Sequence, residues 1–186
     1  MSLRSSEILD FWFAGDAADL HQKWFKKSAE FDTACARFTA AIRHARAGRF
    51  DHWALTAKGG LALVVLLDQL SRNVFRGAAE AFEADPHART IARGMIAAGF
   101  DTALTPVERM FIYLPFEHGE TIEDQDQSIR LFETLRDALG ADSIDYAYRH
   151  RDAIRAFGRF PHRNAALGRI NTPAEAAWLA QHPTGF

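Results

Sequence analysis

The chain has 186 residues, a formal net charge of −2 and a sequence pI near 6.4. A single domain is the expectation for this length, and the near-neutral charge argues against general nucleic-acid binding, which usually needs a strongly basic domain. With 48% hydrophobic and 25% charged residues, the composition is that of an ordinary globular protein. We therefore expect one folded domain over residues 1–186 that binds no nucleic acid.

Cysteine usage and apolar runs exclude further classes of protein. Cys35 is the only cysteine, so an internal disulfide and a cysteine-based zinc cluster are excluded. The first residues form no long apolar segment and include Glu7 and Asp10, unlike a secretory signal. The longest aliphatic run, Leu61–Leu67, is far shorter than the ~20 residues of a membrane span. These features predict a cytoplasmic protein with no membrane association.

The first half of the chain shows helical periodicity. Residues that cap helix N-termini precede apolar residues spaced three and four apart. In chain order, the predicted elements are a helix from Ser5 or Ser6, a short helix or turn over residues 16–25, a helix from Ser28 to Gly48, a connector containing Trp53, and a buried helix from Thr56 to about Ser71.

The second half contains three helix starts in which proline follows a capping residue, as is typical of a first helical turn. The predicted elements are a helix from Asp85 to Gly94 or Gly99, a helix from Thr105 broken by Pro115, a helix from Thr121 or Glu123 to Gly140, a helix from Asp142 to Gly158, and a short helix from Thr172. No strand alternation accompanies them. The sequence therefore predicts an all-α domain of antiparallel helix pairs.

The first of three polar stretches, residues 68–77 (DQLSRNVFRG), follows the buried apolar run directly. Asp68 and Arg72 are four residues apart, the spacing at which helical side chains pair. In one interpretation Arg72, Asn73 and Arg76 form the edge of an anion site. In the other, Asp68 neutralises Arg72 while Asn73 caps the end of the helix. The sequence leaves both interpretations open.

The second stretch, residues 115–120 (PFEHGE), places carboxylates beside an imidazole. That combination orients a histidine tautomer and tunes a general base, which makes Glu117, His118 and Glu120 candidate catalytic residues. An ordinary loop with a satisfied histidine is one alternative. Another is a metal site formed by His118, Glu120, His150 and His162. The lack of a cysteine pair excludes a zinc deaminase, and we predict no metal and no cofactor.

The third stretch, residues 157–169 (FGRFPHRNAALGR), interleaves cations with apolar side chains. Buried charge of this kind is costly unless it is paired or binds something. The stretch follows a helix on which His150 shares a face with Tyr146, Ile154 and Phe157, so we expect His150 to point inward. Either His150 is a satisfied core residue, or it is catalytic and belongs to one site with the candidate ligand-binding residues Arg159, His162, Arg163 and Asn164.

Together with the WF pair near the start, these three stretches resemble the bacterial domain-of-unknown-function family 924 over nearly the whole chain. The resemblance implies an all-helical fold of the tetratricopeptide-like type, a superhelix of helix pairs. It brings no established activity, substrate or catalytic residue. The positions of this sequence that match the family motifs are Asp68, Gln69, Arg72, Asn73, Arg76, Pro115, Glu117, His118, Glu120, His150, Phe157, Gly158, Arg159, Phe160, Pro161, His162, Arg163, Asn164, Gly168 and Arg169.

Three functions agree with these observations. The first is a pocket for a small phosphate- or carboxylate-bearing molecule, in which arginines clamp the anion and His118 or His150 moves a proton; the sequence leaves open whether the protein is an enzyme. The second is a tetratricopeptide-like module that holds an acidic peptide. The third is structural, a buried ion-pair network that fixes how the helices cross. The oligomeric state does not follow from the sequence.

Overall fold

The computed structural model describes residues 3–16, 23–24, 26–183 and 185. Within these residues every regular element is helical, which confirms the all-α prediction. The chain divides into two compact units: Met1–Arg76 with Glu80–Leu104, the N-terminal unit, and Gly77–Ala79 with Thr105–Phe186, the C-terminal unit. The single-domain and superhelix predictions concern the arrangement of these units and remain predictions.

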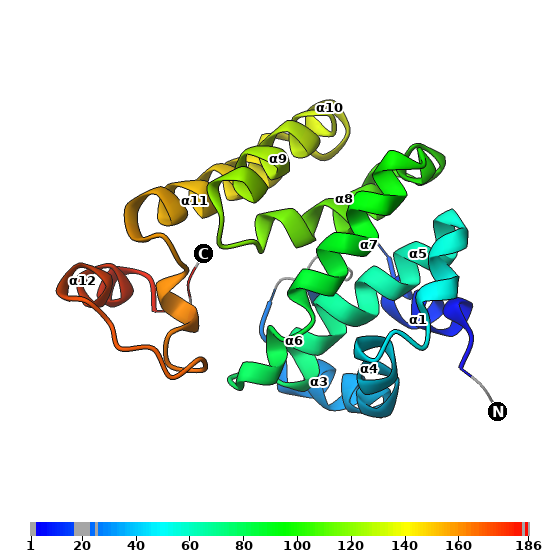
Figure 1. The fold of residues 1–186 in the computed structure, drawn as a ribbon, viewed down its shortest axis with the longest axis horizontal. Helices are drawn as coiled ribbons and strands as arrows, with labels where there is room; N and C mark the ends of the chain where they lie inside the picture. Colours follow the sequence, from blue (N-terminus) through cyan, green and yellow to red (C-terminus); the bar gives the residue numbers. More distant parts are fainter. Residues whose placement is uncertain (1–2, 17–22, 25, 184, 186) are drawn as a thin grey trace. The chain divides into compact units, whose positions relative to one another are not determined.

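The N-terminal unit is organised around one buried helix, which we call the central helix (Figure 1). It begins as α5 (Ala57–Val64), continues through a π-helical turn, η3 (Val65–Leu70), and ends as α6 (Ser71–Val74). Residues 59–71 are all buried. The elements that pack on this helix are α1 (Ser5–Trp12), α3 (Ala29–Cys35), η1 (Ala36–Phe38), α4 (Thr39–Arg46), η2 (Asp51–Leu55), α7 (Asp85–Ala97) and η5 (Phe100–Ala103). A short turn, η4 (Ala79–Ala81), precedes α7 in the chain.

The C-terminal unit is a set of helices in contact with their neighbours along the chain. It contains α8 (Pro106–Glu117), α9 (Ile122–Glu133), α10 (Arg136–Leu139), α11 (Ala141–Phe157), η6 (Pro161–Arg163) and α12 (Pro173–Gln181). Helix α9 packs against both α8 and α11, as Figure 1 shows for α9 and α11, and η6 packs against α12. Buried aromatic side chains of α8 and α9 meet here, with Tyr113 and Phe132 edge to face at 6.3 Å between ring centroids.

Most of the predicted helix starts are confirmed. In each case a hydroxyl oxygen accepts a hydrogen bond from a main-chain N–H of the first turn, which satisfies a donor that has no partner within the helix. The N-caps that do so are Ser28, Thr56, Thr105, Thr121 and Thr172. Helix α11 ends just before Gly158, which adopts the left-handed conformation expected of a helix terminator.

The end of α1 is closed by side chains from a later segment. The ammonium group of Lys23 donates to the main-chain carbonyls of Phe11, Trp12 and Ala14 at 2.7, 3.2 and 3.3 Å. The indole of Trp24 donates to the carbonyl of Trp12 at 3.0 Å. Most of the short helix or turn predicted over residues 16–25 lies outside the described residues.

Two predicted boundaries are wrong, the first because tertiary packing overrides local preference. Pro115 does not break its helix: α8 continues to Glu117, and residues 110–117 are all buried. Packing on this scale offsets the roughly 3 kcal/mol that a proline costs inside a helix. The central helix likewise does not end near Ser71 but continues to Val74.

Other differences are local. The predicted helix from Ser28 to Gly48 is interrupted by the tight turn η1, and the one predicted to reach Gly140 ends as α9 at Glu133 before α10 begins. Asp85 and Asp142 lie in the first turns of their helices instead of capping them. For Asp85 the reason is that its carboxylate binds Arg72.

Cys35 is buried. Burial, together with the nearby charge of Asp32, raises the pKa of its thiol to about 12, so the thiol stays protonated and unreactive near neutral pH. Of the helices in the part of the chain that the structure describes, none has both the length and the apolar composition of a membrane span.

Two helical glycines of the N-terminal unit allow a test of this packing. A Cβ at Gly59 would lie 2.2 Å from the main-chain oxygen of Trp53, whereas a Cβ at Gly94 would have no heavy atom within 4 Å. We expect Gly59→Ala to lower the free energy of unfolding by about 1–3 kcal/mol, the usual cost of overpacking. Urea unfolding followed by circular dichroism measures it.

Gly94→Ala is the matched control, and it should raise the free energy of unfolding by about 0.5–1 kcal/mol because alanine loses less backbone entropy on folding. Equal effects of the two substitutions would contradict the close approach of α5 to the carbonyl of Trp53.

Candidate functional site

Arg72 lies on α6, directly after the π-helical turn, and is held by two carboxylates. Its two terminal nitrogens donate to the two oxygens of Asp85 at 2.9 Å each, and Nη1 lies 3.2 Å from Oδ1 of Asp68. The predicted i, i+4 pair is therefore confirmed. Burial lowers the pKa of Arg72, but the charges of Asp68 and Asp85 outweigh burial and the pKa is raised.

Asp68 has no exposed surface and is satisfied within its own segment. Its Oδ2 accepts a hydrogen bond of 2.6 Å from Nε2 of Gln69, and its main-chain carbonyl accepts one of 2.7 Å from Arg72. A buried carboxylate that lacked such donors would be strongly destabilising. The contacts within residues 68–72 thus account for a charge in the middle of an apolar helix.

Arg76 and Asn73 share one carboxylate, that of Asp32 on α3. Arg76 forms a two-point contact with it at 2.6 and 2.8 Å, and Asn73 donates to Oδ1 at 2.9 Å. Burial raises the pKa of Asp32, but these hydrogen bonds outweigh burial and the pKa is lowered. Asn73 therefore binds Asp32 instead of capping the helix.

The turn that follows α8 is fixed by a glutamine. Nε2 of Gln125, a buried residue of α9, donates to the main-chain carbonyls of Glu117 and Gly119 at 2.7 Å each. A Cβ at position 119 would come within 2.6 Å of Asp124, so only glycine is accommodated. This turn holds the backbone of Glu117 and His118 in place at the end of the helix.

His150 lies on the buried side of α11, as predicted, with 8% of its surface exposed. Its Nδ1 is 2.8 Å from the main-chain carbonyl oxygen of Tyr146 and 3.5 Å from Oε1 of Glu117. A carbonyl oxygen accepts only, so Nδ1 carries the proton and Nε2 carries the lone pair of the neutral ring. The prediction that Tyr146 shares this buried face is wrong, because that side chain is 46% exposed.

A carboxylate, two imidazoles and a guanidinium surround His150. Burial lowers its pKa well below the ordinary value, the hydrogen bond to Tyr146 opposes this, and the charges of His118, His162 and Arg163 lower the pKa further. The rings of His118 and His150 lie 6.4 Å apart, and Phe160 packs edge-on against His150 at 5.5 Å. We call His118, His150, His162 and Arg163 the imidazole cluster.

Glu120 binds both ends of the segment that follows Gly158. It accepts the main-chain N–H of Phe160 at 2.9 Å and a two-point contact from Arg169 at 2.7 and 3.0 Å. Arg169 also donates to the carbonyl oxygen of Phe160 at 3.0 Å. Burial raises the pKa of Glu120, but the hydrogen bonds from Arg169 and Phe160 outweigh burial and the pKa is lowered.

Arg159 binds the first turn of α12. Its Nε and Nη2 donate to the two oxygens of Glu175 at 2.6 and 2.9 Å, and Nη2 also donates to the main-chain oxygen of Ile170. Glu175 additionally accepts the main-chain N–H of Thr172 at 2.7 Å. The hydrogen bonds from Arg159 and Thr172 hold the pKa of Glu175 well below its usual range.

The predicted site residues therefore fall into two groups. In the C-terminal unit, His118, His150, His162 and Arg163 gather around one buried ring, with Glu117 next to His150. The others bind partners within their own unit; they are Arg72, Asn73, Arg76, Glu120, Arg159 and Asn164. Sequence reasoning missed Asp32, Asp85, Gln125 and Glu175 as partners, because they lie outside the three stretches and only the fold brings them close.

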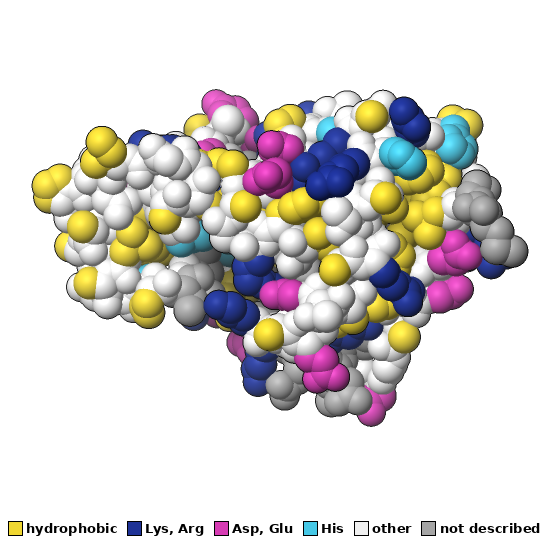
Figure 2. Space-filling model, turned by 90° about the horizontal axis from the view of Figure 1, so that it is seen from below, with side chains coloured by type: hydrophobic (Ala, Val, Ile, Leu, Met, Phe, Trp, Pro, Cys, Tyr) yellow, Lys and Arg dark blue, Asp and Glu magenta, His cyan; other side chains and the backbone are white. Residues whose placement is uncertain are grey.

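The hypothetical metal site of His118, Glu120, His150 and His162 is not assembled. Over the described residues no group of three or more histidine, cysteine or carboxylate side chains is placed to hold a metal ion, and Glu120 binds Arg169. On the face shown in Figure 2, basic and acidic side chains are interspersed, and neither sign covers a broad area. This distribution agrees with the many ion pairs of the two units.

The model of the family described as "Bacterial protein of unknown function (DUF924)" matches residues 8–183. The chain belongs to this family. A solved structure of a protein of unknown function from Agrobacterium tumefaciens is similar to it: the two chains are 40% identical, the alignment covers 95% of this chain and 97% of the other, and the TM-score is 0.84. None of the curated proteins matches the chain. The resemblance drawn from the polar stretches is confirmed, and the DUF924 family supplies no activity.

The environment of His150 in this DUF924 protein can be tested by measuring the pKa of its imidazole. We expect its NMR-determined pKa to lie below the ordinary value of about 6.5, and Arg163→Gln to raise it because one neighbouring positive charge is removed. The unfolded chain binds a proton at higher pH than the folded one, so the free energy of unfolding falls as the pH is lowered from about 6.5 towards the folded pKa. His150→Gln should remove that part of the pH dependence. A pKa at or above the ordinary value would contradict the burial of the ring.

A second prediction concerns the carboxylate that binds Phe160 and Arg169. Glu120→Gln retains the shape of the side chain but removes its charge, and we expect it to lower the free energy of unfolding by about 1–3 kcal/mol, as for lost hydrogen bonds to a charged group. Asp152→Asn, on the exposed face of α11, is the control and should change it by less than about 0.5 kcal/mol. Similar values for both variants in urea unfolding would show that Glu120 does not hold the segment.

Proposed function

We propose that this protein binds a small anionic molecule, with a phosphate or carboxylate group, at the imidazole cluster of its C-terminal unit. The observation that supports the proposal is the gathering of imidazole rings and a guanidinium in one place: the rings of His118 and His150 lie 6.4 Å apart, and the ring of Phe160 contacts His150, His162 and the guanidinium of Arg163. A bound anion would accept hydrogen bonds from the guanidinium and from imidazole N–H groups. The guanidinium of Arg163 supplies the planar fork that matches phosphate and carboxylate oxygens.

His150 is the proton-accepting group in this proposal. Its Nδ1 donates to the carbonyl of Tyr146 and faces Glu117, which orients the ring and leaves the lone pair on Nε2. A bound anion raises the pKa of His150 towards neutrality, where a general base is most effective. Binding of the anion is therefore coupled to uptake of a proton by His150. This keeps the predicted role of His150 in proton transfer.

The remaining polar residues of the three stretches have a structural role in our proposal. Arg72, Arg76 and Arg159 each form a two-point contact with a carboxylate of their own unit. Such pairs fix how one element lies on another, although their net contribution to stability depends on burial. Of the four arginines first considered, we retain Arg163, because its guanidinium lies over the ring of Phe160, which also contacts His150 and His162. The peptide-binding module remains a separate prediction.

The test is a titration of isotopically labelled protein with inorganic phosphate and with acetate, followed through the histidine ring resonances by NMR. We expect saturable shifts of His118, His150 and His162, and a rise in the pKa of His150. Arg163→Gln should weaken binding roughly tenfold to a hundredfold, as for the loss of charge-assisted hydrogen bonds. Arg163→Lys, which keeps the charge without the fork, should give an intermediate affinity.

Arg76→Gln is the control, because that guanidinium already binds Asp32, and it should leave the affinity unchanged. Thermal melting of each variant separates the two roles of arginine. If Arg163→Gln lowers the Tm on the order of 10 °C and phosphate moves none of the three imidazoles of the parent protein, Arg163 belongs to the structural network and the binding proposal is wrong.

A further inference from the structure

The members of the imidazole cluster differ in how far they are accessible from solvent. His150 and Arg163 are 8% and 5% exposed, whereas His118 and His162 are half-buried. A molecule that reaches the cluster from solvent therefore meets one of these two rings first. At His162 the structure provides room for more than a small inorganic anion.

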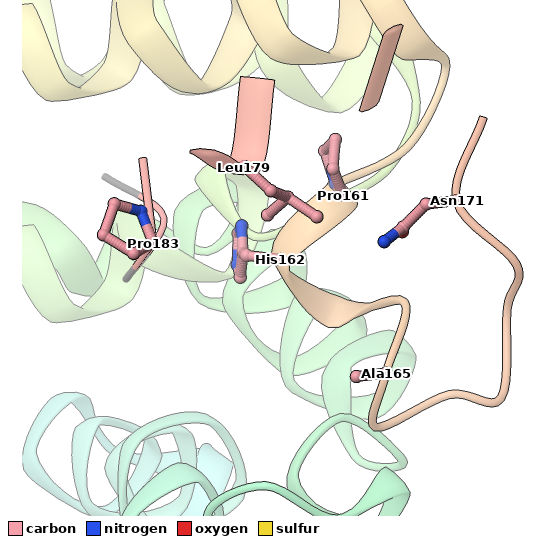
Figure 3. A pocket seen from close by; sticks show the side chains of 6 residues that line it. All are labelled: Pro161, His162, Ala165, Asn171, Leu179 and Pro183. Atoms are coloured by element: carbon pink, nitrogen blue, oxygen red, sulfur yellow. The ribbon is translucent and has the colours of Figure 1, made fainter. Parts of the chain in front are cut away.

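Beside His162, in the C-terminal unit, lies a hollow of about 320 Å³ (Figure 3). At about 30 Å³ for each non-hydrogen atom, as in liquid water, it has room for roughly ten such atoms. The hollow is open to solvent, since three of its lining residues, Ala165, Asn171 and Pro183, are exposed. Its lining residues are Pro161, His162, Ala165, Asn171, Leu179 and Pro183.

His162 connects the hollow to the imidazole cluster. Its ring packs against Phe160 at 5.6 Å between ring centroids, and the guanidinium of Arg163 lies over the same phenylalanine ring, 4.6 Å from its centroid. Figure 3 shows the ring of His162 at the wall of the hollow, near Leu179 and Pro183. When an anion accepts a hydrogen bond from His162 on this side, the rest of the molecule lies in the hollow.

The lining of the hollow favours a hydrocarbon group next to the anion. Pro161, Ala165, Leu179 and Pro183 offer aliphatic surface, and covering such surface is favourable because it is removed from water. Among the lining residues that the structure describes there is no guanidinium or ammonium group that could pair with a second anionic group of the ligand. One anionic group with an aliphatic part therefore fits this lining better than a polyanion.

The charge of the cluster favours a carboxylate over a phosphate. Arg163 is the member of the imidazole cluster that carries a fixed charge, and Glu117 places a carboxylate oxygen 3.5 Å from Nδ1 of His150. A phosphate monoester carries about −1.5 to −2 charges at neutral pH, which is more than one guanidinium neutralises. A carboxylate carries one charge, and its two oxygens match the fork of an arginine.

We infer that the ligand of the imidazole cluster is a short aliphatic carboxylate of about four to six carbon atoms, a size that the hollow accommodates. The carboxylate group accepts hydrogen bonds from Arg163 and His162, and the hydrocarbon chain packs against Leu179 and the two prolines. Leu179 is thereby a specificity-determining residue. This inference rests on the proposed anion binding and narrows its ligand from phosphates and carboxylates to one class.

The experiment compares acetate, isobutyrate and isovalerate, which share a carboxylate and differ in the length of the chain. Each is titrated into the labelled full-length protein at constant pH and ionic strength, and NMR follows the ring of His162 and the methyl groups of Leu179. We expect the affinity to rise about twofold for each carbon, or about eightfold from acetate to isovalerate. Full burial of a methylene is worth about fourfold, and an open hollow buries about half of it. Isovaleramide, which has nearly the same shape but no charge, should bind at least about tenfold more weakly than isovalerate because it lacks charge-assisted hydrogen bonds.

Substitutions in the lining test whether the hollow causes this rise. Leu179→Asn keeps the size of the side chain but makes it polar, and it should reduce the eightfold gain to about twofold or less. The affinity for acetate should stay unchanged, which shows that the cluster is still folded. Ala177→Asn, at an exposed position of the same helix, is the matched control and should leave the gain intact.

A second variant covers the case in which Leu179→Asn does not fold. Ala165→Gln, at an exposed lining position, places a polar side chain in the hollow without disturbing buried residues, and it should at least halve the gain from acetate to isovalerate.

The outcomes separate this inference from the anion-binding proposal. If neither acetate nor phosphate shifts any imidazole, anion binding is wrong and this inference falls with it. If acetate binds but the longer carboxylates bind no more tightly, or if the lining variants leave the gain intact, only the present inference is overturned. It is also overturned if isovaleramide binds as tightly as isovalerate.

Discussion

The arrangement of polar side chains in the C-terminal unit depends on the hydrogen bonds of the Glu120 carboxylate. It binds the main-chain N–H of Phe160 and the guanidinium of Arg169, so both ends of the segment between them are attached to one side chain from the turn after α8. Arg163 and Asn164 lie between those two points. Arg163 lies near His150 and Asn164 contacts Asn171. These positions follow from the closed segment together with its one short turn of helix, η6.

The sequence was a good guide wherever structure is decided within a few residues. A hydroxyl followed three residues later by a glutamate specifies its own helix start, and Thr105 and Thr172 do so as predicted. It was a poor guide where distant packing decides. Pro115 remains inside a helix because its neighbours are buried on all sides. Asp85 does not cap α7 because Arg72, thirteen residues earlier, binds its carboxylate.

The same division applies to the site. The motifs indicated that His150 faces inward. They also indicated that arginines, histidines and glutamates of separate stretches interact. They did not indicate which arginines are neutralised. In the sequence Asp32 looks like an ordinary helix-surface acid, Asp85 looks like a helix cap, and Glu175 looks like half of a capping box. Each becomes the partner of a motif arginine only through the fold. A cation that looks available in the sequence is therefore weak evidence for a ligand until its carboxylate partners are known.

The π-helical turn of the central helix limits how the chain length can vary. This turn carries one residue more than an α-helical turn, and Asp68 and Gln69 lie within it. Each residue added to or removed from a helix rotates everything beyond it by about 100°. A deletion within residues 65–70 would restore a regular helix, which is locally favourable, yet it would turn Arg72 and Asn73 away from Asp85 and Asp32. Within this family, the spacing between the apolar run and the RN pair should therefore be more strictly kept than the identity of the apolar residues themselves.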